Sequence, residues 1–171
     1  MNALLAFYYG SHTDDRGRRL AEILRQDDAW MEFTHDYIQW LFPLAEPSGV
    51  NPRAPLVDSA TAELFRSDPL LQDHLRAAFA RMLRFLGLRY VDGEVTKAAN
   101  WDARKGDWFT EPTHNSLRVT RLIKSLRLLG MDAEAQALHR GLVALCATEP
   151  DAGIDATART FWRDAAESPV K

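Results

Sequence analysis

The run Phe33-Thr34-His35-Asp36-Tyr37-Ile38-Gln39-Trp40-Leu41-Phe42-Pro43-Leu44 surrounds a few polar residues with aromatic and aliphatic ones. Read as a helix at about 100° per residue, the apolar side chains cover an arc of roughly 200°, wider than a surface helix needs; they are Trp30, Phe33, Tyr37, Ile38, Trp40, Leu41 and Phe42. We therefore predict a buried aromatic helix over about residues 28–42, ended by Pro43. The remaining arc is a polar stripe that must meet water or partners on another helix: Glu32, His35, Asp36 and Gln39.

Helical periodicity also covers most of the remaining chain. It predicts helices over about residues 14–26, 59–65, 69–86, 113–129, 132–147 and 155–166. The short Gly130-Met131 link makes two of them an antiparallel helical hairpin. Asp92-Gly93 between β-forming residues favours a type I′ turn, so we expect at most one short β-hairpin. Together these elements predict an all-α fold, a helical bundle around the buried aromatic helix.

Composition narrows the class of protein. With 171 residues, of which 46% are hydrophobic and 26% charged, one domain over residues 1–171 is expected. The net charge of -3 argues against a nucleic-acid partner. The single cysteine, Cys146, lies in an apolar run and is expected to be a buried, inert thiol. No run approaches the roughly 18 apolar residues of a membrane span, and the start lacks the basic region of a signal peptide. We expect a cytoplasmic protein without a transmembrane segment, and composition leaves the oligomeric state open.

A second polar row lies on the helix expected over residues 113–129. His114, Arg118, Arg121 and Ser125 follow the spacing i, i+4, i+7 and i+11, which aligns them on one face. Two guanidinium groups and an imidazole near a helix N-terminus suit a carboxylate or a phosphate. These arginines could instead pair with protein carboxylates or lie in solvent. If the row faces the acidic stripe, an Asp36–Arg121 pair could be structural, or a cleft between them could hold a zwitterion.

The loop over residues 43–58 contains four prolines. Within it, Asn51-Pro52 favours a turn, and Arg53 could fold over a neighbouring cleft; alternatively, Asn51 only satisfies groups of the loop backbone. No HExxH, CxxC, P-loop or GxSxG motif occurs, so zinc-protease, redox, NTPase and hydrolase readings lack a signature. We therefore predict no catalytic residues, no metal site and no cofactor.

Several blocks of the chain match one known family. They are residues 35–44 with Asn51 and residues 54–56, residues 114–126 with Leu129-Gly130, and the opening segments 7–10 and 15–18. Over about residues 5–147 the chain resembles the conserved N-terminal domain of the opioid growth factor receptor family. The resemblance implies relation to a vertebrate receptor that is linked to methionine enkephalin binding and growth control, and that is unrelated to the seven-helix opioid receptors. It brings no catalytic residues. The Ala/Arg-rich composition suggests a bacterial relative without the C-terminal repeats, for which an opioid ligand would make little sense.

These observations predict a noncatalytic, receptor-like binding module for a small zwitterionic or anionic ligand or a peptide. Its site would consist of residues from both polar rows, with two loop residues at the mouth: His35, Asp36, Gln39, His114, Arg118, Arg121, Asn51 and Arg53. Two alternatives stay open. One is an enzyme of unknown reaction that uses His35 or His114 in acid–base chemistry. The other is a scaffold in which both polar rows are salt-bridged and no small molecule binds.

Overall fold

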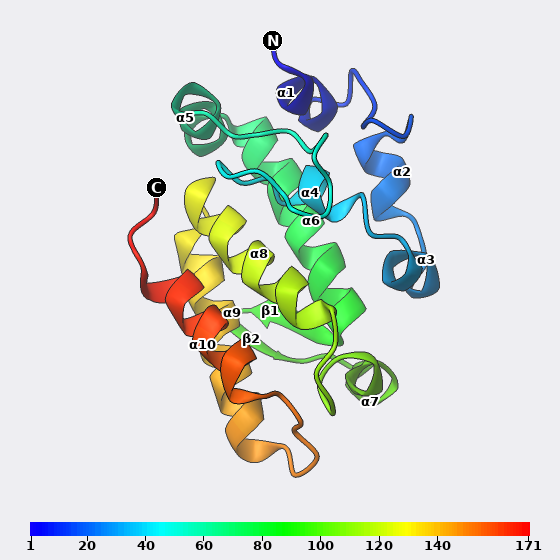
Figure 1. The fold of residues 1–171 in the computed structure, drawn as a ribbon, viewed down its shortest axis with the longest axis vertical. Coiled ribbons are helices and arrows are strands. Elements are labelled where there is room, and N and C mark those ends of the chain that lie inside the picture. Colours follow the sequence, from blue (N-terminus) through cyan, green and yellow to red (C-terminus); the bar gives the residue numbers. More distant parts are fainter. The chain divides into compact units, whose positions relative to one another are not determined.

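The computed structural model describes all 171 residues, and it is predominantly helical with one two-stranded antiparallel sheet (Figure 1). The predicted fold class is thereby confirmed. The chain divides into two compact units, residues 1–81 (unit 1) and residues 82–171 (unit 2). None of the helices has the length and apolar content needed to cross a lipid bilayer.

Unit 1 is made of short helices joined by loops. They are α1 (Ala3–Tyr8), α2 (Leu20–Leu24), α3 (Asp28–Phe33), α4 (Ile38–Leu41), α5 (Ser59–Ser67) and the first part of α6 (Pro69–Leu86). Side chains of Asn2, Asp27 and Asp58 cap α1, α3 and α5 by accepting a backbone N–H of the first turn. The core consists of fully buried apolar side chains, among them Phe7, Tyr8, Ile23, Met31, Tyr37, Leu41, Phe42, Phe65, Leu71 and Leu75.

The segment over residues 28–42 is fully buried only from Tyr37 onward, and it is not one helix. Tyr37 and Trp40 are 0% and 5% exposed, which confirms their predicted burial. The helix, however, stops at Phe33, which is 81% exposed, and Thr34 adopts an extended conformation. The Tyr37 hydroxyl donates to the Met31 carbonyl at 3.0 Å, so the chain turns back before α4 begins. Of the polar stripe, Glu32 therefore lies on α3, His35 and Asp36 on the break, and Gln39 on α4, and not along one continuous helix.

The helix expected over residues 14–26 is also shorter, because only Leu20–Leu24 is helical. The Asp14 carboxylate accepts the backbone N–H groups of Arg16 and Arg18, each at 2.9 Å. Gly17, at a φ of 78°, turns the chain between them. The N-terminal apolar residues form α1, a helix that the sequence did not predict.

Unit 2 follows the predicted elements closely. Its elements after the end of α6 are β1 (Leu88–Val91), β2 (Glu94–Lys97), α7 (Trp101–Arg104), the 3₁₀ turn η1 (Lys105–Asp107), α8 (Asn115–Leu128), α9 (Asp132–Thr148) and α10 (Ala156–Glu167). Asp92 and Gly93 both have positive φ, as the predicted type I′ turn requires. The expected hairpins, β1–β2 and α8–α9, are both present.

The core of unit 2 forms where α8, α9 and α10 pack on one another (Figure 1). The predicted apolar face of α8 is buried, including Val119, Leu122, Ile123 and Leu126. Beside it lies an aromatic cluster with ring centroids 5.0–6.4 Å apart, formed by Trp101, Trp108, Phe109 and Trp162. The Trp108 indole N–H donates to the Leu86 carbonyl and the Trp162 indole N–H to the Ser116 carbonyl, so both buried rings keep a hydrogen bond.

Candidate functional site

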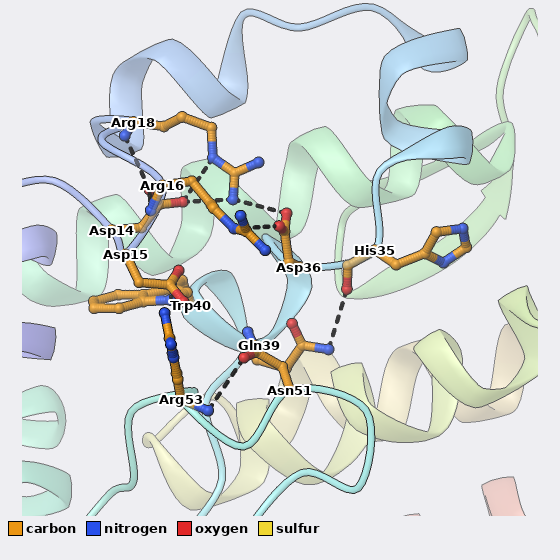
Figure 2. A network of polar contacts seen from close by, with 10 residues as sticks. All are labelled: Asp14, Asp15, Arg16, Arg18, His35, Asp36, Gln39, Trp40, Asn51 and Arg53. Atoms are coloured by element: carbon orange, nitrogen blue, oxygen red, sulfur yellow. Dashed lines mark hydrogen bonds and ion pairs between the residues drawn. The ribbon is translucent and has the colours of Figure 1, made fainter.

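A polar network in unit 1 gathers around Asp36, at the break between α3 and α4 (Figure 2). The loop before α2 supplies two arginines to it. Arg18 Nη2 lies 2.9 Å from Asp36 Oδ1, and Arg16 Nε lies 3.0 Å from Asp36 Oδ2. Arg18 also donates through Nε to Asp14 at 2.7 Å, and the Asp14 side chain is fully buried. Asp36 therefore has two guanidinium partners within its own unit.

The Arg18 guanidinium is the centre of this charge network. Its partial burial alone lowers the pKa of Arg18, but hydrogen bonds and attraction from Asp14 and Asp36 outweigh that effect and raise the pKa overall. The guanidinium carbon also lies 5.4 Å from the centroid of the Trp30 ring, a cation–π distance. Arg18 thus stays charged and ties the loop to both the carboxylates and the aromatic segment.

The network contains two side-chain amides. In each of them one polar atom forms a hydrogen bond with the protein and the other forms none. The Gln39 amide nitrogen donates to the His35 carbonyl at 3.2 Å, and the Asn51 side-chain oxygen accepts the backbone N–H of Arg53 at 3.2 Å. These bonds determine how each amide is oriented. Gln39 Oε1 and Asn51 Nδ2 are then left buried without a hydrogen-bond partner. One buried acceptor and one buried donor are therefore unsatisfied; Figure 2 shows both amides.

Arg53 and His35 are the other predicted site residues of unit 1. Arg53 is exposed, and Figure 2 shows its side chain extending toward Trp40, whose indole N–H donates to Asp15 at 3.1 Å. The His35 side chain is exposed and its imidazole points away from the amides (Figure 2). His35 therefore contributes its main-chain carbonyl to the network and not its ring.

The predicted basic row lies on α8 and just before it, in unit 2. His114 is exposed and precedes the first helical residue. Arg118 is only 6% exposed, and its guanidinium lies 5.8 Å from the centroid of the Phe85 ring. Arg121 is half-buried and Ser125 is buried. Arg118 is therefore a buried cation and not a solvated one, whereas a joint site of this row with the unit 1 residues stays a prediction.

Sequence reasoning missed the arginines and aspartates that complete the network. Residues 14–19, Asp-Asp-Arg-Gly-Arg-Arg, were assigned to the start of a helix. The signal that could have found them is Gly17 within this charged run, because a glycine three residues after an aspartate is typical of a turn. No group of three or more histidine, cysteine, aspartate or glutamate side chains is placed to hold a metal ion.

The sequence profile of the opioid growth factor receptor conserved region matches residues 5–150, which include every residue of both polar rows. The chain belongs to this family. It is 42% identical to the human opioid growth factor receptor over 107 residues, which are 60% of this chain and 15% of that protein. It is 38% identical to mouse opioid growth factor receptor-like protein 1 over 105 residues, or 60% of this chain and 22% of that protein.

A frog relative extends the same match. The opioid growth factor receptor-like protein 1 of Xenopus tropicalis is 37% identical over 121 residues, which are 68% of this chain and 23% of that protein. The chain thus spans less than a quarter of the length of these relatives. No solved structure matches it.

Proposed function

We propose that this family domain is a noncatalytic binding module for a short peptide or another small zwitterionic or anionic ligand. The observation that carries the proposal is the pair of buried, unsatisfied amide atoms, Gln39 Oε1 and Asn51 Nδ2. Leaving a buried polar atom unpaired costs about 1–3 kcal/mol. A peptide backbone offers N–H groups that can donate to Gln39 Oε1 and carbonyls that can accept from Asn51 Nδ2.

Charged groups around the two amides suit the ends of such a ligand. Arg53 is exposed, and the Arg16 side chain is 65% exposed although its Nε pairs with Asp36, so both can meet a carboxylate. The Asp36 side chain is 30% exposed and can meet an ammonium group. These charges support a zwitterion over a plain anion.

The basic row supplies the second part of the proposal. We include His114, Arg118 and Arg121 as ligand-binding candidates because guanidinium groups bind carboxylates in a planar, bidentate manner. If Arg121 holds a ligand, Arg121→Ala leaves thermal stability nearly intact and removes ligand-induced stabilisation. If Arg121 instead neutralises a buried protein carboxylate, the same change costs about 3–5 kcal/mol.

The bacterial origin and the cytoplasmic location also stay predictions.

A thermal-shift screen tests the amide site directly. Wild type and Gln39→Met are screened with amino acids, short peptides including methionine enkephalin, and nucleotides. A ligand at a hundredfold excess over its dissociation constant adds about 2.7 kcal/mol of stability to the wild type. We expect a short peptide to give this shift, methionine enkephalin to give none, and Gln39→Met to abolish the shift.

Gln136→Met is the matched control. Gln136 is likewise a helical glutamine whose amide nitrogen donates to a main-chain carbonyl, that of Ala166 at 2.7 Å, although it is half-buried where Gln39 is buried. This variant should keep the wild-type ligand shift. If no compound shifts the wild type and Arg121→Ala is strongly destabilised, the protein is a scaffold and the binding proposal is wrong.

A further inference from the structure

Unit 2 contains a pocket of about 220 Å³ between α9 and α10. Its apolar walls are Leu142, Val143 and Ala147 on α9 and Trp162 on α10. The α9 residues, together with His139 and Cys146, recur at helical spacing and form one stripe. An engineered apolar cavity of roughly 150 Å³ in another protein holds a benzene ring, so this pocket has room for a phenyl group or a short alkyl chain.

Two titratable side chains in the wall are uncharged at neutral pH. Burial lowers the pKa of His139, and the charge of Arg163 adds to this, while Glu167 opposes it. Burial raises the pKa of the Cys146 thiol, and the charge of Arg159 opposes this only in part. Neither group therefore supplies a charge to a bound molecule.

The one charged group in the lining is Arg159, in the first turn of α10. Its Nε donates to the Ile154 carbonyl at 3.1 Å, which holds the side chain in place. Its two terminal amino groups make no hydrogen bond or ion pair in the structure.

We propose that the α9–α10 pocket binds a small hydrophobic carboxylate, with the apolar part against Leu142 and Trp162 and the carboxylate on Arg159. A guanidinium with both amino groups available forms paired hydrogen bonds to a carboxylate. Apolar walls with one convergent charge are also the usual design of a small-molecule site. The pocket shares no residue with the binding site proposed above, and Arg159 and Trp162 also lie outside the family match over residues 5–150.

Cys146 makes the pocket directly testable, because it is the only cysteine of the chain. Its reaction with the neutral reagent N-ethylmaleimide is followed in the presence of phenylacetate or hexanoate, each compared with its neutral amide. The acids should slow the reaction several-fold in a saturable manner. The amides should need about tenfold higher concentrations, because they lose one charge-assisted interaction.

Three variants assign the charge preference to one side chain. Arg159→Gln should remove the difference between acid and amide, and Arg159→Lys should keep part of it. Arg163→Gln is the control, because Arg163 lies one turn further along the same helix, is exposed and does not line the pocket. It should behave as the wild type does.

Two results would overturn the proposal. One is equal protection of Cys146 by acids and amides in the wild type, and the other is no protection by any of these compounds. Far-UV circular dichroism of each variant verifies its fold. Because Gln39→Met leaves the pocket unchanged, a loss of peptide binding in that variant together with intact protection of Cys146 separates the two proposed sites.

Discussion

The two units differ in the kind of contact that stabilises each of them internally. In unit 1 none of the helices α1 to α4 exceeds six residues, and buried polar side chains join them. Arg81, only 5% exposed, bonds both the Gln26 carbonyl and the Asp28 carboxylate, and Arg18 joins Asp14 to Asp36. In unit 2, helices of 14, 17 and 12 residues pack through apolar stripes and large rings. Short helices leave many backbone groups without intrahelical partners. The stability of unit 1 therefore depends on hydrogen bonds and ion pairs, whereas that of unit 2 depends on a close-packed apolar core.

The largest effect is expected from a substitution in the packed core of unit 2. Trp162 is 2% exposed in the aromatic cluster, whereas its neighbour Phe161 is 51% exposed. Trp162→Ala should lower the free energy of unfolding by about 3–5 kcal/mol, and Phe161→Ala by less than about 0.5 kcal/mol. Urea denaturation measures both. Similar losses in the two variants would show that the ring cluster is not the core of unit 2.

The next effect tests the polar contacts of unit 1. Asp14→Asn removes the charge of a fully buried carboxylate and leaves Arg18 with Asp36 alone, which should cost about 2 kcal/mol. Glu63→Gln is the control in the same unit. Glu63 is 73% exposed and only 3.5 Å from Arg66, so its loss should stay below about 0.5 kcal/mol. If denaturation shows equal losses, the buried pair contributes no more than a surface pair.

A smaller effect on stability is expected in unit 1 at acid pH. The Tyr9 hydroxyl donates to the Asp68 carboxylate in unit 1 and lowers the pKa of Asp68 below its ordinary value of 3.8. Stability from this bond is present above pH 3.8 and is lost as the pH falls through the lowered pKa. In Tyr9→Phe the melting temperature should therefore fall less steeply below pH 4 than in the wild type. An unchanged acid profile would exclude this contact as a source of acid sensitivity.

The smallest effect belongs to unit 2 and lies at higher pH. Burial lowers the pKa of His139 below its ordinary value of 6.5, so the folded protein takes up a proton there less readily than the unfolded chain. The stability gained by keeping this ring neutral is present above pH 6.5 and is lost as the pH falls through the lowered pKa. His139→Gln should flatten the melting-temperature profile between pH 7 and 5. A profile that keeps its wild-type slope would contradict this assignment.

The same contrast explains which elements the sequence could predict. Elements of unit 2 carry local signals, since Gly87, Asp92-Gly93 and Gly130 mark where helices and strands end. The break after Phe33 has no such signal, because the apolar periodicity continues through Trp40. Just past the break, Asp36 pairs with arginines of the loop before α2. Helical periodicity does not record a partner about 20 residues away in sequence.

The candidate site could be predicted in part for the same reason. Asp36, Gln39, Asn51 and Arg53 stand out because they are polar residues within or beside an apolar run. Arg16 and Arg18 do not stand out, since nothing in a charged run says which members are drawn into the interior. The unsatisfied halves of the Gln39 and Asn51 amides also depend on which backbone groups the other halves bind, and that is a property of the folded chain alone.

The position of α1 has a consequence for synthesis of the protein on the ribosome. α1 is made well before two of its partners: the Tyr8 carbonyl contacts His74, 66 residues on, and Tyr9 donates to Asp68, 59 residues on. At cellular translation speeds this is a delay of roughly 3–13 s. During this delay Phe7 and Tyr8 can meet only their earlier partners, Trp40 and Leu41, each 33 residues on. The contacts of α1 with α4 can therefore form during translation before its contacts with Asp68 and with α6.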